Sequence, residues 1–214
     1  AAALAAEGMD FDKLQRRTDG ILARELRGRG GGGADRWRFL GSLTCRGPVW
    51  RFDTAGTLCP QIYQIQDSYG LAWPMLERIH AAARARGFRA VVCPSPEHPD
   101  RIEHLLLPGL GLAFVTSREG MVYDGPAYRR VRVDAMIPAA YCKRFRSRLR
   151  FTRRMVQVLR EEGMAALGEA KAAHDQLEAV YHPHVDFDGV AGLTARELER
   201  MERRLEALGE GPRP

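Results

Sequence analysis

The spacing of apolar residues divides the chain into a helical start, a centre of short strands and a long helical end. Residues 9–26 carry apolar side chains at roughly helical spacing, which predicts a first helix. The same spacing returns over residues 138–181, where Gly163 and Gly168 predict a break or bend. Residues 121–134 indicate a hairpin or an irregular sheet edge. Strands are predicted at residues 39–44, 49–53, 61–66, 90–94 and 112–117.

A helix predicted over residues 71–86 separates the third of these strands from the fourth. Leu76, Ile79 and Ala83 share one of its faces, and Gly87 stands where a helix often ends in a left-handed residue. A strand, a helix and a second strand in this order usually form two parallel strands joined by a right-handed crossover. The pattern therefore predicts an α/β fold in which helices cover the faces of a sheet.

A run of glycines separates the first helix from the strands. Residues 27–33 read RGRGGGG, and glycine loses more backbone entropy than any other residue when it is fixed. We therefore predict a flexible linker over residues 27–35. This linker separates a helical segment at residues 1–26 from an α/β domain at residues 36–137. A helical extension that packs on this domain is predicted at residues 138–208.

Two short segments of the chain are alike. The sequence MDFDKL at residues 9–14 matches VDFDGV at residues 185–190, and each is followed by a helix that contains Ala-Arg-Glu-Leu. The match indicates that the first copy is the helical tail of a preceding repeat, whose own domain lies elsewhere. We then expect Phe187 and Val190 of the second copy to be buried. The matching residues of the first copy, Phe11 and Leu14, should be more exposed.

The loop between the third strand and the following helix is the candidate binding site. Phosphates bind at such loops in α/β proteins, because the helix N-terminus offers free N–H groups. A working phosphate loop, G-x-x-x-x-G-K-[ST], needs glycines, a lysine and a hydroxyl. Residues 67–74 read DSYGLAWP, so they offer Gly70 but no lysine, and Asp67 adds a negative charge. We predict that Trp73 and Tyr69 fill the vacated pocket, and the alternative is that they stack on a base.

Three stretches of the chain carry a family resemblance, and they read RWRFLGSLTCRGPVWRFD from residue 36, CPSPEHPDRIEHLLLPGLGLAFVTS from residue 93 and HDQLEAVYHPHVDFDGV from residue 174. Over residues 36–201 the chain resembles the second half of an uncharacterised bacterial family of predicted ATPases with two tandem P-loop halves. The most specific residues are Asp100, Glu103, His104 and Pro108. The resemblance implies a P-loop NTPase-like three-layer sheet with helices on both faces, followed by a long helical C-terminal segment.

The resemblance also implies that relatives carry a full P-loop where this chain departs from it. Gly70 matches a retained glycine, Ala72 replaces a glycine, and Trp73 and Pro74 stand near the lysine and the Ser/Thr. We therefore predict a non-catalytic structural or regulatory domain that acts with a separate intact P-loop half. The alternative is an ATP-binding protein or ATPase subunit with a remodelled loop. ATP and Mg²⁺ would be required only under this alternative. The candidate nucleotide-binding residues are Ser68, Gly70, Trp73, Glu103 and His104.

Arginine supplies nearly all of the positive charge of this chain, which has 214 residues and a net charge of +6. Between residues 139 and 160 there are eight basic residues and no acidic one. We predict a solvated helix face whose arginine stems cover apolar surface. The alternative is a polyanion-binding module that contacts nucleic acid or an acidic partner.

The histidines and cysteines that could form a metal or redox site are interpreted as structural residues. His174 and Glu178 lie one helical turn apart, as in metal sites, but the apolar stripe around them predicts a packing or capping role. The four cysteines form no C-x-x-C pair, which predicts buried, reduced thiols. No metal site and no catalytic residue are predicted. The chain lacks a membrane-spanning run and a secretion signal, so we predict a soluble, cytoplasmic protein.

Overall fold

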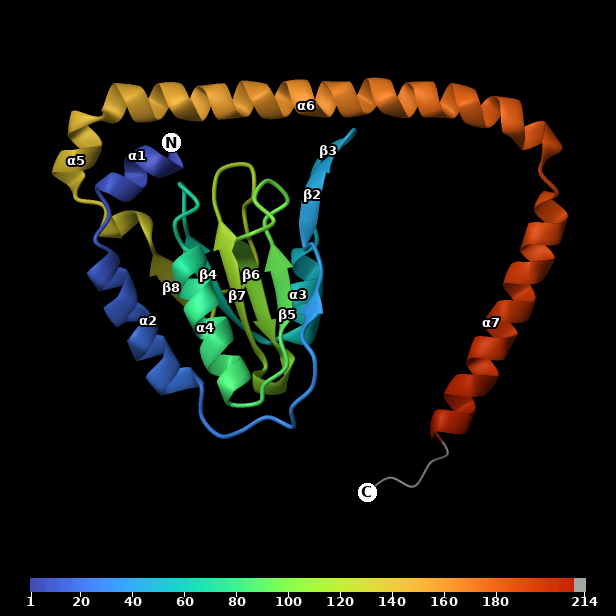
Figure 1. Ribbon diagram of the computed structural model, residues 1–214, viewed down its shortest axis with the longest axis horizontal. Helices are drawn as coiled ribbons and strands as arrows, with labels where there is room; N and C mark the ends of the chain where they lie inside the picture. Colours follow the sequence, from blue (N-terminus) through green and yellow to red (C-terminus); the bar gives the residue numbers. More distant parts are fainter. Residues whose placement is uncertain (210–214) are drawn as a thin grey trace. The chain divides into compact units, whose positions relative to one another are not determined.

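The computed structural model describes residues 1–209 and divides the chain into two compact units. The first unit is Ala1–Gly168, and the second begins at Glu169. The strands are β1 (Arg36–Trp37), β2 (Gly41–Thr44), β3 (Gly47–Trp50), β4 (Gln61–Gln66), β5 (Val91–Pro94), β6 (Ile102–Leu107), β7 (Leu112–Ser117) and β8 (Arg129–Arg132) (Figure 1). The α-helices are α1 (Ala2–Glu7), α2 (Phe11–Glu25), α3 (Phe52–Leu58), α4 (Trp73–Ala85), α5 (Ala139–Arg144), α6 (Arg146–Tyr181) and α7 (Phe187–Gly209).

Within residues 1–209, six of these strands form one sheet in the order β1-β5-β6-β7-β4-β8, and β2 pairs with β3 in a separate hairpin. Strand β6 is antiparallel to β5 and β7, whereas the other neighbouring pairs in the sheet are parallel. The predicted α/β class is confirmed, with a mixed sheet and a long helix after it. Because β6 runs the other way, its N-terminal end meets the carboxyl ends of its neighbours at one end of the sheet.

Several predicted elements have the predicted bounds. Strands β4 and β7 match the expected ranges residue for residue, and β5 begins one residue later than expected. Helix α4 follows β4 as predicted, and Gly87 after it has a φ of 77°, which favours glycine. Two predicted strands became β2 and β3, which pair only with each other because the chain turns into α3 at Phe52. The predicted irregular edge at residues 121–134 contains the parallel edge strand β8.

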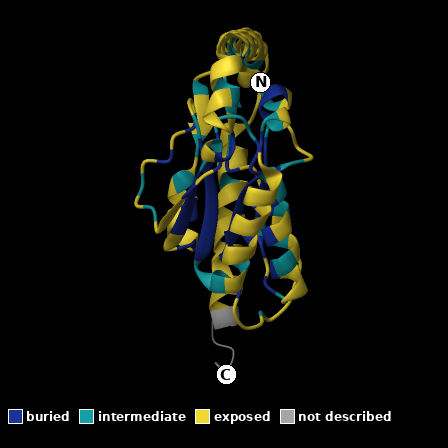
Figure 2. Ribbon diagram, turned by 90° about the vertical axis from the view of Figure 1, so that its left-hand side faces the viewer, coloured by how far each residue is buried: buried dark blue, intermediate teal, exposed yellow. Residues whose placement is uncertain are grey.

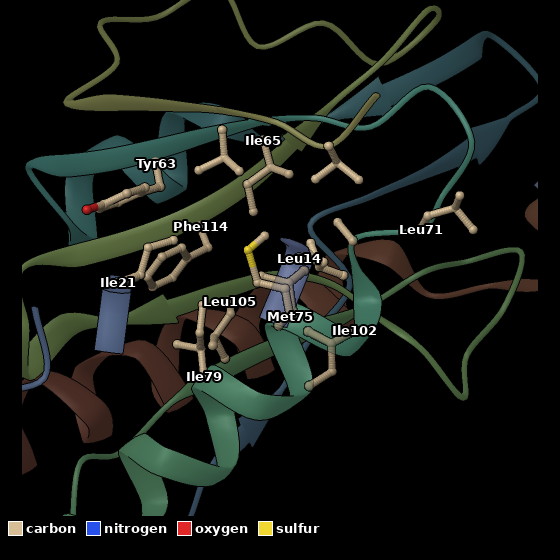
Figure 3. Close-up of a cluster of buried hydrophobic side chains, with 14 of the residues drawn as sticks. Leu14, Ile21, Tyr63, Ile65, Leu71, Met75, Ile79, Ile102, Leu105 and Phe114 are labelled. Carbon is tan, nitrogen blue, oxygen red and sulfur yellow. The ribbon is translucent and has the colours of Figure 1, made fainter. Parts of the chain in front are cut away.

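The core of the first unit lies on both faces of the sheet. One cluster joins the strands to α2 and α4, and Figure 3 shows Tyr63 and Phe114 from the strands pointing toward Ile21 of α2 and Ile79 of α4. A smaller cluster on the other face includes Ala55 of α3. Figure 2 shows that the buried residues gather on the strands and that the outer helix surfaces are exposed. Helices therefore cover both faces of the sheet.

The glycine run forms a packed connection. The N–H of Gly30 donates to the carbonyl of Arg86, and the N–H of Gly32 donates to the carbonyl of Gly87, both at 2.9 Å. A Cβ at Gly30 would lie 2.3 Å from the Gly87 carbonyl oxygen, so a larger residue does not fit. Glycine is needed here for close approach at the end of α4, and backbone hydrogen bonds hold this part of the run against it.

Two expectations about the helices are wrong. Helix α6 continues through Gly163 and Gly168 without the predicted break. The expected burial of the similar segments is wrong at three of four positions, because Leu14 is 3% exposed in the core whereas Phe187 and Val190 are each 54% exposed. Phe11 is 43% exposed, as expected for the first copy. The first copy therefore starts a helix that packs on the sheet that follows it, and it is part of the same compact unit.

Candidate functional site

A cavity of about 640 Å³ lies at the carboxyl end of the parallel strands. Its walls come from the loop after β4, the segment between β5 and β6, the residues after β7 and the first part of α6. The volume falls within the range of about 300–1,000 Å³ that is typical of ligand sites. Open α/β sheets bind ligands outside the carboxyl ends of their strands, so this cavity is the candidate site.

The loop after β4 is closed by two carboxyl groups of the chain itself. The Oδ1 of Asp67 accepts the N–H of Leu71, and its Oδ2 accepts the N–H of Ala72, each at 2.8 Å. Asp134 accepts the backbone N–H of Ser68 at 2.8 Å and the Ser68 hydroxyl at 2.7 Å. Burial raises the pKa of Asp67, and the two backbone N–H groups partly oppose that rise. The two N–H groups directly before α4 are therefore already occupied.

Glu103 lies on β6 and lines the cavity, although the residue is only 6% exposed. Its Oε1 accepts a hydrogen bond from Arg118 at 2.5 Å. Its Oε2 is buried and has no hydrogen-bond partner among the described residues. Burial raises the pKa of the Glu103 carboxyl, and the charge of Arg118 opposes that rise.

His104, the next residue of β6, belongs to the protein interior. Its Nδ1 accepts the backbone N–H of Thr116 at 3.1 Å, and its ring packs edge-on against Phe52. Its Nε2 lies 3.6 Å from the Oε2 of Glu103 and has no hydrogen-bond partner among the described residues. Burial lowers the pKa of His104 to about 3, so the ring is neutral at ordinary pH.

Arginines outnumber carboxylates in the cavity wall. The arginines are Arg101, Arg118, Arg150, Arg153, Arg154 and Arg160, and the carboxylates are Asp67, Glu97, Glu103 and Glu119. Arg160 donates to both oxygens of Glu97 at 2.7 and 2.9 Å, which ties α6 to the loop after β5. Arg118 is paired with Glu103. Two of the four carboxylates are therefore neutralised within the wall.

Of the remaining arginines, Arg101 lies 3.8 Å from the carboxyl of Asp100, which is not part of the wall, and the others add their charge to the cavity. The guanidinium of Arg153 lies 4.6 Å from the ring centre of Tyr69, and that of Arg101 lies 5.4 Å from the ring centre of Trp73. Arg150 and Arg154 have no ion pair or hydrogen bond from their side chains within the described part of the chain. The cavity thus combines positive charge with two aromatic rings.

The structure brings most of the predicted site residues together. Ser68, Gly70, Trp73 and Glu103 all line the cavity, whereas His104 does not. Trp73 is more than half buried, as we predicted. Gly70 has a φ of 68°, so glycine is required there by the turn itself. Ser68 is engaged by Asp134 and is not free to bind a metal ion.

Three residues of the site were not predicted from the sequence. Glu97, Arg118 and Asp134 each follow the carboxyl end of a strand, namely β5, β7 and β8. That position in an α/β sheet is itself a signal for site residues. The sequence did not reveal it for Asp134, because the edge strand before it was not predicted.

The group of side chains with metal-ligand spacing lies in the second unit. Among the described residues, His174, Asp175 and Glu178 of α6 form the one such group, and all three are exposed. The Nδ1 of His174 lies 3.6 Å from the Oε1 of Glu178. The predicted packing role of His174 is wrong, because its side chain is open to solvent. Exposed pairs of this kind are ordinary helix-surface contacts.

The cysteines are free thiols with different surroundings. Cys59 and Cys93 are buried, whereas Cys45 is exposed, so the prediction of buried thiols is wrong for Cys45. Burial raises the pKa of Cys59 to about 11 and that of Cys93 to about 12. Both buried thiols therefore stay protonated and unreactive at neutral pH.

Comparisons beyond the chain add little to this description. Within residues 1–209, no helix is both long enough and apolar enough to cross a membrane. No family model matches the chain, and no curated protein or solved structure is significantly similar to it.

Proposed function

We propose that the chain is a non-catalytic α/β domain of the P-loop NTPase-like kind, with a structural or regulatory role beside a separate intact P-loop half. One observation carries the proposal: both carboxyl oxygens of Asp67 accept backbone N–H groups, from Leu71 and Ala72. In a working phosphate loop, the backbone N–H groups of the loop and of the helix start hold phosphate. Here a side chain of the protein occupies two of these N–H groups, directly before α4.

The rest of the loop supports the same function. No lysine lines the cavity within the described residues, and the Ser68 hydroxyl donates to Asp134. Phosphoryl transfer needs a lysine and a metal ion to neutralise charge on the transferred group. A loop without these groups has no means of activating ATP, so no cofactor is expected.

ATP hydrolysis by the purified full-length chain tests this proposal. We expect no Mg²⁺-dependent turnover above background, because neither the lysine nor the metal ligand is present. Steady turnover that is abolished by Trp73→Ala would overturn the proposal. Saturable binding of ATP without turnover, lost in the same variant, would instead support the alternative of an ATP-binding subunit with a remodelled loop.

A second candidate function is polyanion binding through the arginine-rich part of α6. The observation that favours it is the placement of Arg150 and Arg154, which line the cavity and have no partner side chain in the described part of the chain. Binding of heparin that weakens steeply with added salt would support this function, since counterion release makes such binding salt-dependent. Retention of the chain on a heparin column only in the absence of salt would count against it.

A further inference from the structure

We infer that the arginine-lined end of the sheet binds single-stranded nucleic acid, an inference that rests on the polyanion-binding function. The binding surface, here called the arginine groove, consists of the cavity described above and a hollow of about 420 Å³ beside it. Tyr69, Arg150 and Arg153 line both, so the two lie side by side. The second hollow adds Lys143 and Arg146.

The charge of the arginine groove extends over a length greater than a small anion. Arg146 and Arg154 are eight residues apart on α6, and at about 1.5 Å per residue they lie roughly 12 Å apart along the helix. Arg150 and Arg153 fall between them and line the same side of the helix. A row of cations with this spacing fits a chain of phosphates better than a single phosphate group.

The aromatic rings favour nucleic acid over other polyanions. Tyr69 and Trp73 lie among the arginines of the groove, and Arg153 and Arg101 lie over their rings. Proteins that bind single strands combine a positively charged groove with aromatic rings on which bases stack. Inorganic polyphosphate and heparin have no aromatic group that could use these rings.

The arginines and the aromatic rings come from different walls of the cavity. Arg150, Arg153 and Arg154 belong to α6, whereas Tyr69 and Trp73 come from the loop after β4 and the start of α4. In a duplex the bases are stacked on one another, so only a single strand offers base faces to such rings. The groove therefore suits phosphates along α6 and unpaired bases toward the sheet.

Binding to a labelled single strand measures this directly. The probe is a fluorescent strand of about 12 nucleotides and mixed sequence, titrated with the full chain by anisotropy. We expect saturable binding that weakens at least about tenfold between roughly 50 and 200 mM salt. An unlabelled single strand should compete better than the same sequence as a duplex, and better than polyphosphate of equal charge.

Matched variants locate the site. Arg150→Ala with Arg154→Ala should weaken binding at least about tenfold, because two phosphate contacts are lost. Arg16→Ala with Arg148→Ala also removes two exposed positive charges, but these residues lie outside the groove, so the loss should be less than about threefold. Trp73→Leu should weaken binding and Trp73→Phe should restore it, since only the ring supports stacking.

The outcomes distinguish single-strand binding from polyanion binding in general. If polyphosphate competes as well as the single strand and Trp73→Leu binds like the wild type, the nucleic-acid inference is overturned, while polyanion binding stands. If both double variants lose affinity equally, the groove is not the site. If neither the single strand nor heparin binds at low salt, both the inference and the polyanion-binding function are wrong.

Discussion

Replacing Asp67 tests the feature on which the proposed function depends. In the variant Asp67→Ala, the N–H groups of Leu71 and Ala72 lose their acceptors while they stay buried. Both groups lie directly before α4, so no carbonyl of that helix can replace the lost carboxyl. The variant therefore leaves the turn that leads into a central helix without its internal acceptor.

The size of the effect follows from three contributions. Hydrogen bonds to a charged group are worth about 1.5–3 kcal/mol each, so two bonds give about 3–6 kcal/mol. The burial that raises the pKa of Asp67, together with the nearby charge of Asp134, offsets part of that gain. We therefore expect a net loss of about 2–4 kcal/mol, which for a chain of this size lowers the Tm by roughly 5–15 °C. Asp67→Asn keeps one acceptor oxygen and should lose about half as much.

Thermal melting with and without inorganic phosphate provides the assay. Phosphate should raise the Tm of Asp67→Ala more than that of the wild type, because an anion can occupy the vacated helix N-terminus. Sodium chloride at equal ionic strength controls for screening, and Asp12→Ala, an exposed first-turn acid of α2, should change stability by less than about 0.5 kcal/mol. Wild-type stability in Asp67→Ala, or equal stabilisation of both proteins by phosphate, would refute the reasoning.

Two further predictions concern the interior of the first unit. Because burial lowers the pKa of His104 to about 3, the unfolded chain binds a proton more readily than the folded chain between that pH and about 6.5. The free energy of unfolding of the wild type should therefore exceed that of His104→Asn by less and less as pH falls below 6.5, with a change of up to about 1.4 kcal/mol per pH unit. Urea titrations of both proteins at pH 7, 6 and 5 measure this difference. A pH-independent difference would contradict the prediction. Gly30→Ala should cost about 1–3 kcal/mol in the same titrations, since its Cβ would meet the carbonyl oxygen of Gly87, whereas Gly31→Ala has open space and should be neutral. Equal effects at both glycines would show that the run is not packed.

Much of the fold could be predicted from local sequence, and the misses share one cause. The short run of strand-forming residues in β4 and the apolar face and C-terminal glycine of α4 are local signals, and both elements were found at nearly their observed bounds. Strand β6 was not predicted, and nothing local reveals that it runs antiparallel to its neighbours. The hairpin of β2 and β3 shows the same limit, because strand-like sequence does not say which strand is the partner.

Only part of the candidate site could be predicted, because some of its contacts depend on the folded backbone. The sequence identified the loop after β4, Trp73 and Glu103, because a strand followed by a loop and a helix has a recognisable pattern. It identified Asp67 only as a negative charge near the expected phosphate. That this carboxyl turns inward onto the start of α4 depends on the backbone path through Gly70, which a motif comparison does not contain. The arginines of the cavity come together only after α6 is placed across the end of the sheet.

The two similar segments separate what a motif specifies from what packing adds. In each copy the first aspartate, Asp10 or Asp186, accepts the backbone N–H three residues later, at 2.8 and 2.9 Å. The sequence therefore fixes a helix start in both places. Yet Leu14 lies in the core and Val190 is exposed, since only the first helix has the sheet and α4 opposite its apolar face within the same unit. The repeat thus marks where a helix begins, and the burial of that helix depends on which surface lies opposite it.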